Sequence, residues 1–369
     1  MSIAILWSMG LLACGKLGDD TGAPAEDLII EDLGSFTTTD GYTGEVTYTV
    51  PDGAASSLVW CGEWGNDMLG ALWYFDGPGG SSIYDGDAGS NTYRAEFLDD
   101  LVPVLMPITP DLPLAAGEHK ANIWIDSPGG EQTVNCGVVH RVSEVGNNAN
   151  VKIELVFVGG DVDAAGAPDD PDLQAALDQL RAEWESAGLI AQVSYKDFAG
   201  DAATYTVVDM SDTDYSEFNA LLRTANPSDD KTVTFFMVEE LSYAGSTTLG
   251  LSAGPPGAAT LQGTSKSGVV VTTVDLRDAP QDVGKIMAHE GGHFLGLYHT
   301  TEKDGGTHDP ISDTAKCDAS NDSDSNGVVN TTECGGKGAE NVMWWTLTSG
   351  TATFTSDQGW VGRRNPTAW

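Results

Sequence analysis

The sequence predicts two folded units: an all-β, sandwich-like domain over residues 34–146, followed by an α+β domain with a mixed sheet over residues 147–369. The chain has 369 residues, and at roughly 100–200 residues per domain this length suggests two domains. In the first part, short alternating or β-branched runs are separated by clusters of Gly, Pro and Asp. After Val151, strand patterns alternate with apolar residues at helical spacing.

The β-domain pattern is clearest in Glu45–Val50 and Ala121–Ile125, where β-branched and aromatic residues form short runs. The segment Asp76–Gly80 marks a turn, because Gly adopts positive φ at little cost. No group of catalytic side chains is evident in this domain, which predicts an accessory role. A substrate-binding or inhibitory role is the alternative, and removal of the domain on activation stays open.

The first strand of the α+β domain is expected at Val151–Val158. A helix opens at Pro171, and apolar residues recur at helical spacing from Leu173 to Trp184. The other expected elements are strands at Ile190–Tyr195, Thr232–Val238 and Val269–Thr273, and a helix around Tyr215–Thr224.

The composition excludes two classes of protein. Hydrophobic residues make up 40% and charged residues 20% of the chain, which indicates a folded protein and not a disordered one. Lys and Arg number 17 against 55 for Asp and Glu, a net charge of −38. Phosphate backbones and anionic lipid surfaces would repel such a chain, so we expect no nucleic-acid partner.

The N-terminus predicts export. Residues Ile3–Ala13 form an apolar run that is too short to span a bilayer and is typical of a signal segment. The run ends in Leu11–Cys14, which resembles the lipobox of bacterial lipoproteins. That resemblance implies a signal segment over residues 1–14, a lipid on Cys14 and a small, polar, flexible tether over residues 15–33. A cleaved ordinary signal and a buried N-terminal helix are the alternatives.

The expected location is therefore the bacterial cell envelope or outer surface, as a lipoprotein, or the medium, as a secreted protein. The only membrane contact expected is a lipid anchor at Cys14.

Apart from Cys14, the chain has four cysteines: Cys61, Cys136, Cys317 and Cys334. An even number in an exported chain predicts two disulfides. Proximity in the sequence pairs Cys317 with Cys334 and leaves Cys61 with Cys136. Because four cysteines allow three pairings, this pairing is a hypothesis.

One segment of the second domain contains the pattern HExxHxxGxxH. On a helix, His289 and His293 lie about 40° apart and one turn along the axis, so both imidazoles can reach one ion. Glu290 lies about 60° from His293, near enough to reach a water on that ion without being a ligand. Gly296 can end the helix with a positive φ and deliver His299 as a third ligand. Three neutral nitrogens and one open position describe a catalytic zinc site.

The helix that carries this pattern has start signals of its own. Asp278 is the expected N-cap, with Pro280 in the first turn and Gln281 at the capping-box position. Gly291 and Gly292 lie inside the helix at about 1 kcal/mol each relative to Ala, a local inconsistency typical of functional sites.

The zinc pattern resembles the signature of the metzincin metallopeptidases, and the chain from about residue 150 to 369 is most similar to the pappalysin-type subgroup. The resemblance implies a zincin/metzincin-like catalytic domain with an active-site helix and a catalytic Zn²⁺ on His289, His293 and His299. In some metalloprotease propeptides, a Cys-Gly pair occupies the metal. Binding of Cys61-Gly62 to the zinc is therefore an alternative to the disulfide expected for Cys61.

Two later segments also resemble metzincins. Asn341–Trp345 is similar to the Met-turn beneath the zinc, with Met343 as its methionine. Several metzincins have a Tyr two residues after the Met, where this chain has Trp345, so a tyrosine role is not carried over. Phe354–Pro366 resembles the last metzincin helix, which has a structural role.

The segment between the zinc motif and Met343 resembles the disulfide-bearing, calcium-binding segment of pappalysins. It includes His308–Thr314, where His308 and Asp309 are expected to belong to an ordinary polar loop. As alternatives, these two residues could be additional calcium ligands, or could form hydrogen bonds to residues that bind the metal. Between Cys317 and Cys334, the sequence fits a DxDxNG…E calcium loop. Its oxygens would come from the side chains of Asp322, Asp324, Asn326 and Glu333 and the carbonyl of Val328. No helical pattern flanks the loop, so we expect a disulfide-closed loop with a structural Ca²⁺; a merely solvated acidic loop is the alternative.

Together these features predict an exported zinc metalloendopeptidase that hydrolyses proteins or peptides as a monomer. Glu290 would act as general base on a water held by the metal and then protonate the leaving amine. In metzincins an edge strand pairs with the substrate backbone, and Leu249–Ala253 is expected there. A non-enzymatic, metal-stabilised cell-surface binding protein is one alternative, and a zinc hydrolase acting on other bonds is a second.

Overall fold

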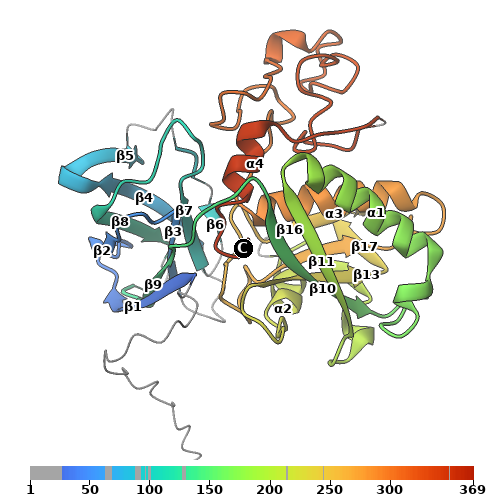
Figure 1. The fold of residues 1–369 in the computed structure, drawn as a ribbon, viewed down its shortest axis with the longest axis horizontal. Helices are drawn as coiled ribbons and strands as arrows, with labels where there is room; N and C mark the ends of the chain where they lie inside the picture. The colour runs from blue at the N-terminus through green and yellow to red at the C-terminus, as the bar shows by residue number, and fades with distance from the viewer. Residues whose placement is uncertain are drawn as a thin grey trace, which may run out of the picture.

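The computed structural model describes residues 27–369 except 63–68, 88–92, 96, 99–100, 127–129, 213–214, 244 and 349. The predicted signal segment and Cys14 lie outside the described residues. Figure 1 shows two units side by side, a β-domain drawn in blue to teal and an α+β domain drawn in green to red, with the C-terminus between them.

Two antiparallel sheets form the β-domain. The first sheet contains, in spatial order, β1 (Leu28–Thr37), β9 (Thr133–Arg141), β3 (Ser56–Gly62) and β7 (Leu101–Met106). The second contains β2 (Val46–Val50), β8 (Gly117–Ile125), β4 (Gly70–Gly77) and β5 (Ser81–Asp85), with β6 (Phe97–Leu98) paired to β4. Alternate residues of β2 are buried, and side chains from both sheets share one apolar core.

The predicted tether over residues 15–33 is corrected at its C-terminal end, because β1 begins at Leu28 and pairs with β9 from Leu28↔Arg141 onward. Most side chains of β1 are exposed or only half-buried. A strand at the edge of a sheet is held by backbone hydrogen bonds and needs no regular apolar period, so the sequence pattern did not reveal it.

The predicted disulfide between Cys61 and Cys136 is confirmed. The two residues lie directly opposite each other on β3 and β9, and both are fully buried. The alternative that Cys61-Gly62 occupies the metal is therefore wrong, since the Cys61 sulfur is bonded to its neighbouring strand.

A five-stranded mixed sheet forms the centre of the second domain. Its order is β11 (Leu189–Asp197), β10 (Ala149–Val158), β13 (Thr232–Val238), β17 (Val269–Thr272) and β16 (Gly250–Ser252). The first four strands are parallel, and β16 is an antiparallel edge strand. These strands match the ranges expected from the sequence to within two residues.

Helices cover both faces of this sheet. Ile153, Leu155 and Phe157 of β10 pack in one core with α1 (Pro171–Ser186) and α3 (Pro280–Phe294), and Val156 and Val158 pack in another with α2 (Ser216–Leu222). A small sheet lies on the α2 side and contains β12 (Val207–Asp209), β14 (Glu240–Tyr243) and β15 (Ser246–Thr248). The remaining helices are α4 (Ser356–Gly362) and the single-turn segments Pro78–Gly80, Ala167–Asp169, Ala202–Thr204 and Ala319–Asn321.

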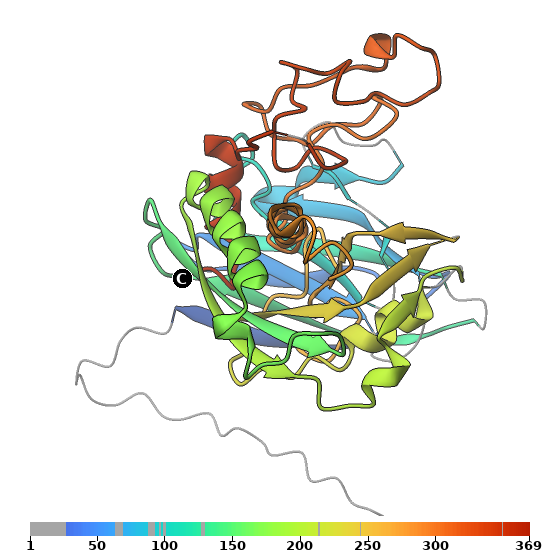
Figure 2. The same cartoon turned by 90° about the vertical axis from the view of Figure 1, so that its right-hand side faces the viewer.

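Between α3 and α4 the chain forms a loop region that projects from the α+β domain in both views (Figures 1 and 2). The expected N-cap at Asp278 is wrong, because α3 begins at Pro280 and its N-cap position is Ala279, which makes no side-chain cap. Proline is favoured at the first helical position and fixes the start there. By contrast, α1 is capped by Asp170, whose carboxylate accepts from two backbone N–H groups.

Polar contacts also join the two domains. The buried Arg141 of β9 donates to the carbonyls of Arg363 and Asn365 after α4. The Ser56 hydroxyl donates to the carbonyl of Arg364. The β-domain is therefore fixed against the C-terminal segment of the second domain.

Candidate active site

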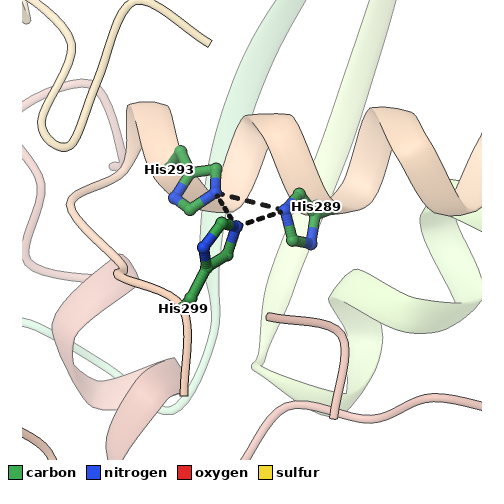
Figure 3. A group of neighbouring side chains, drawn as sticks. All are labelled: His289, His293 and His299. Carbon is green, nitrogen blue, oxygen red and sulfur yellow. Dashed lines mark hydrogen bonds between the residues drawn. The ribbon is translucent and has the colours of Figure 1, made fainter. Parts of the chain in front are cut away.

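Three histidines converge at the end of α3 (Figure 3). His289 and His293 lie one turn apart on the helix. Gly296 has φ +100° and turns the chain back, which brings His299 to the same point. The three Nε2 atoms lie 3.1–3.2 Å from one another. The structure therefore brings together all three residues that the sequence predicts as ligands.

The other ring nitrogen of each histidine has a separate partner. Nδ1 of His289 lies 2.7 Å from the Val342 carbonyl, and Nδ1 of His293 lies 2.7 Å from the Leu297 carbonyl. Each of these Nδ1 atoms donates its proton, because a carbonyl can only accept. The Nε2 lone pairs are then left to face one another, which is the tautomer that metal-binding histidines adopt.

This donor set fits zinc. Nitrogens bound at 2.0–2.1 Å to one tetrahedral ion lie about 3.3 Å apart, close to the spacing observed here. Burial and then the neighbouring imidazoles lower the pKa of His289 to about 3 and that of His293 well below its usual value. Both rings are therefore neutral at pH 7, as ligation requires.

Glu290 points into the same region and is 9% exposed. Burial raises the pKa of its carboxyl to about 8, opposed by a hydrogen bond from the Ser252 backbone. Glu290 lines two cavities, one toward each end of α3. The structure therefore places a buried carboxyl group with a raised pKa beside the three histidines.

The two cavities flank Glu290. The first, here called the Glu183 cavity, has a volume of about 460 Å³ and is lined by residues that include Glu183, Lys285, Ile286 and Leu347. The second, here called the Arg94 cavity, has a volume of about 450 Å³ and is lined by residues that include Arg94, Leu251, His299 and Glu302.

Strand β16 forms the rim that joins the two cavities. One of its edges pairs with β17, from Gly250↔Val271 to Ser252↔Val269, and its other edge has no partner strand among the described residues. The strand lies directly against α3, since a Cβ at Gly250 would lie only 2.5 Å from a methyl carbon of Ile286. The segment expected at the sheet edge, Leu249–Ala253, is found there.

Comparison with known proteins agrees with this geometry. Residues 224–363 match the model of a peptidase family described as pregnancy-associated plasma protein-A, the pappalysins. The predicted resemblance to the pappalysins is confirmed. The matched residues include all three histidines and Glu290. This match indicates a metalloprotease, and the family implies a zinc cofactor.

No curated protein matches the chain. Among solved structures, metalloproteinase-II from Bacteroides fragilis is similar at 14% identity and a TM-score of 0.31, covering 48% of this chain and 59% of that one. The VP2 subviral particle of infectious bursal disease virus is similar at 13% identity and a TM-score of 0.20, covering 37% of each chain. The chain thus spans less than two thirds of either neighbour, and TM-scores this low do not establish a shared fold.

The residue predicted for a metzincin-like Met-turn, Met343, is fully buried beneath α3. Its backbone N–H donates to the Asn341 side chain, which in turn is hydrogen-bonded to Gln358 of α4. A Cβ at Gly292 would lie 2.5 Å from the Met343 sulfur, and one at Gly291 would lie 2.6 Å from the Trp184 ring. Close packing therefore explains both glycines inside the helix.

We expect Gly292→Ala to lower the free energy of unfolding by roughly 1–2 kcal/mol, because the added methyl group must displace Met343 and overpack the helix. Chemical denaturation measures this change. Gly335→Ala is the control, since this exposed glycine has nothing nearer than 3.8 Å. Because Ala is intrinsically the better helix former, a more stable Gly292→Ala protein would show that Met343 does not require the glycine.

Trp345 occupies the position where several metzincins have tyrosine, and it lines both cavities. Its indole N–H donates to the Val329 carbonyl at 2.9 Å. A tryptophan ring, held by this hydrogen bond, thus lies where those metzincins have a phenol. Tyr298 supplies a phenol elsewhere in the Arg94 cavity, but its hydroxyl donates to the Arg94 carbonyl at 2.8 Å.

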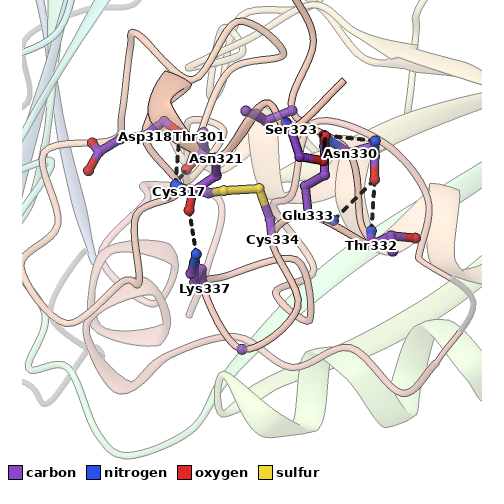
Figure 4. Close-up of a disulfide and its surroundings, with 12 residues drawn as sticks. Thr301, Cys317, Asp318, Asn321, Ser323, Asn330, Thr332, Glu333, Cys334 and Lys337 are labelled. Carbon is purple, nitrogen blue, oxygen red and sulfur yellow. Dashed lines mark hydrogen bonds between the residues drawn. A yellow bond between two sulfur atoms is a disulfide. The ribbon is translucent and has the colours of Figure 1, made fainter. Parts of the chain in front are cut away.

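The second predicted disulfide, between Cys317 and Cys334, is confirmed and closes the acidic loop (Figure 4). Asp322, Asp324 and Glu333 bring carboxylate oxygens close together. The two oxygens of Glu333 accept hydrogen bonds from Ser323 and Asn330. As expected, the loop is not part of a helix-loop-helix unit: the single turn Ala319–Asn321 precedes it and no α-helix follows before α4 in the described residues.

The remaining loop ligands are partly engaged within the loop. The carboxylate oxygens of Asp322 accept from the backbone of Asn326 and Gly327, and the Asn326 side-chain oxygen accepts from the Val328 N–H. His308 pairs with Asp318 at 3.3 Å, outside the carboxylate cluster. Asp309 is buried, which raises its pKa to about 7 against a hydrogen bond from Thr314. Calcium at this loop stays a prediction.

Three side chains of the site were not identified from the sequence: Arg94, Glu183 and Glu302. Glu302 lies three residues after His299, a spacing that could have marked it as a partner of that ring. Glu183 is one turn along α1 from Gln179, with which it forms a hydrogen bond, and carries no motif. Arg94 lies in the other domain, so no local pattern connects it with the zinc motif.

Proposed function

We propose that the protein is a zinc-dependent endopeptidase that cleaves extracellular proteins or peptides. The observation that carries this proposal is the convergence of three Nε2 atoms beside Glu290, on the wall of a cleft. The rim of this cleft is a strand edge that no other described strand pairs with. A purely structural metal site is closed by four protein ligands and has no use for a buried carboxylate beside it.

His289, His293 and His299 would hold the metal. When bound, zinc supplies Lewis-acid chemistry, which polarises the scissile carbonyl and lowers the pKa of water. The Glu290 carboxylate takes a proton from the attacking water, whose oxygen forms the new bond to the carbonyl carbon. The C–N bond then breaks, and Glu290 passes the proton to the amine nitrogen.

The unpaired edge of β16 is suited to hold the substrate backbone in extended form. β16 runs from the Glu183 cavity, which Thr247–Leu249 line, to the Arg94 cavity, which Leu251 and Ser252 line. A substrate strand antiparallel to β16 runs in the opposite direction. Its residues before the scissile bond would then lie in the Arg94 cavity, and the side chain after it would enter the Glu183 cavity.

The Glu183 cavity favours a long basic side chain. Glu183 is 2% exposed; its Oε1 accepts from Gln179, and its Oε2 has no hydrogen-bond partner among the described residues. The Lys285 ammonium group pairs with Asp282 at 2.9 Å and donates to the Thr348 carbonyl at 3.2 Å, and it forms no hydrogen bond to Glu183 in the described part of the chain. A Lys or Arg side chain would satisfy the free oxygen of Glu183 with a charge-assisted hydrogen bond.

A non-enzymatic, metal-stabilised surface protein is the second candidate, and the absence of a catalytic tyrosine after Met343 favours it. Incubation of the purified protein with an unfolded protein and a peptide library, followed by mass spectrometry, separates the two. Zinc-dependent cuts, enriched before Lys or Arg, support the peptidase. Stoichiometric zinc without cleavage supports the binding protein.

We further propose that the Asp322–Glu333 loop binds one structural Ca²⁺. Glu333→Gln is expected to weaken calcium binding roughly tenfold or more, because the last position of such a loop supplies a bidentate carboxylate. Calorimetric titration measures the affinity, with Glu340→Gln, an exposed residue beyond the disulfide, as the control. Equal heats for the parent and Glu333→Gln would contradict the proposal.

For its location, we propose an exported monomer anchored through Cys14. Two disulfides are consistent with an exported protein. Within the described part of the chain, none of the helices is both long and apolar enough to cross a membrane. Metabolic labelling with a fatty acid, compared between the parent and Cys14→Ser, tests the anchor.

A further inference from the structure

His299 differs from the other two histidines in how its ring is held. His289 and His293 lie on α3 and bond through Nδ1 to backbone carbonyls. His299 lies in the loop after Gly296, and its Nδ1 is 2.9 Å from Oε2 of Glu302. The ring with the least support from secondary structure therefore depends on a side chain for its orientation.

Glu302 is held in turn by the β-domain. Its other oxygen, Oε1, accepts from Nη2 of Arg94 at 2.7 Å. The Arg94 and Glu302 side chains are 17% and 29% exposed, so the pair is largely shielded from water. With one oxygen facing His299 and the other facing Arg94, the carboxylate has a defined orientation.

Arg94 is fixed by its own neighbours. Its guanidinium carbon lies 4.7 Å from the centre of the Tyr298 ring, and the Tyr298 hydroxyl donates to the Arg94 carbonyl at 2.8 Å. The preceding residue, Tyr93, is buried in the β-domain and donates to the Leu105 carbonyl. Arg94 is thus bound on one side to the β-domain core and on the other to the residue that precedes His299.

The β-domain also packs on the turn between the second and third histidines. A Cβ at Gly296 would lie 2.6 Å from a methyl carbon of Leu105 on β7. Tyr298 is 4% exposed and belongs to the apolar core of the β-domain. Both the turn and the residue before His299 therefore rest on the first domain.

We propose that Arg94 is a positioning residue for the metal ligand His299, so that a side chain of the β-domain supports the metal centre of the second domain. This inference rests on the proposed zinc site. Arg94 holds the Glu302 carboxylate against the Nδ1–H of His299, which keeps the Nε2 lone pair of that ring directed at the metal. Removal of Arg94 frees the carboxylate to rotate toward water, and the ring loses its anchor.

The test measures metal binding directly in the full-length protein. We expect Arg94→Ala to weaken zinc binding by about 10- to 100-fold, which is the usual effect of removing residues that orient metal-bound histidines through hydrogen bonds. Competition with a chromophoric chelator gives the zinc affinity, and the visible absorption of the cobalt-substituted protein reports ligand geometry. Arg94→Lys retains the charge but not the planar fork, so its zinc affinity should lie between those of the parent and Arg94→Ala.

Arg277→Ala is the matched control, because Arg277 also bridges carboxylates, those of Asp170 and Asp172, but is 41% exposed and lies outside both cavities. It should leave zinc affinity and the cobalt spectrum unchanged. Glu302→Gln combined with Arg94→Ala should be less damaging than the sum of the two single changes, because both act on one contact.

A folded Arg94→Ala protein, checked by thermal unfolding, that binds zinc like the parent and has the same cobalt spectrum would overturn the proposal. If Arg94→Ala is unfolded, the Arg94→Lys and Glu302→Gln affinities decide by the same criterion. The readout does not use peptide cleavage. Failure of the peptidase proposal would leave the zinc result intact, and failure of the Arg94 proposal would leave cleavage by the parent intact.

Discussion

Replacing Glu290 with glutamine is expected to lower kcat/KM for peptide cleavage by about 10²–10⁴-fold and to leave one zinc bound per chain. Glutamine has nearly the same shape but cannot take a proton from water, so the change removes the base without emptying the site. The raised pKa of Glu290, about 8 through burial, is that of a group that can take and return a proton near neutral pH.

The measurement combines initial rates on a peptide substrate with metal analysis of the same sample. Glu185→Gln provides a matched control on the exposed surface of α1 and should cleave at the parental rate. A Glu290→Gln protein that keeps its zinc and cuts like the parent would show that the proton is carried by another group.

The second large effect concerns the side chain after the scissile bond. We expect the parent to cleave most rapidly before Lys or Arg, and Glu183→Gln to lower kcat/KM for those peptides by about 10- to 100-fold, since a buried hydrogen bond to a charged group contributes about 1.5–3 kcal/mol. Peptides with methionine at that position should be cleaved by both proteins at similar rates. Glu185→Gln again serves as the control.

The preference for Lys over Met after the scissile bond should also depend on pH, and it should weaken as the pH falls. Burial, opposed by Gln179 and Lys285, raises the pKa of Glu183 to about 7. Below that pH the carboxyl is protonated and no longer attracts a cation, so the ratio of kcat/KM for lysine and methionine peptides should fall between pH 8 and pH 6. Titration of the catalytic groups affects both peptides equally and therefore does not change the ratio. In Glu183→Gln the ratio should not vary with pH. A flat ratio in the parent would exclude Glu183 as the specificity group.

The parts of the site that the sequence predicted are those encoded locally. His289, Glu290 and His293 lie on one helix, and Gly296 fixes the turn to His299, so spacing alone determines their convergence. The calcium-loop pattern and the disulfide that closes it are local in the same sense. The strands of the mixed sheet were also predicted well, because buried parallel strands form continuous apolar runs.

Other features depend on contacts between distant segments and left no local signal. Arg94 reaches Glu302 across 208 positions of the chain, and Glu183 lies on α1, about one hundred residues before the histidines. The edge strand that begins at Leu28 lacks an apolar period because only its backbone is needed for pairing. Such tertiary contacts become visible only once the two domains and the layers of the sheet are placed.

We propose that one zinc held by His289, His293 and His299 makes this chain a peptidase. Titration of zinc into the metal-free protein, with peptide cleavage followed at each addition, tests it most directly. We expect cleavage to rise with each addition and to reach its plateau at one zinc per chain, while Glu290→Gln binds the same zinc and cleaves at a small fraction of that rate. Full zinc occupancy of the parent without cleavage of any protein or peptide would contradict it.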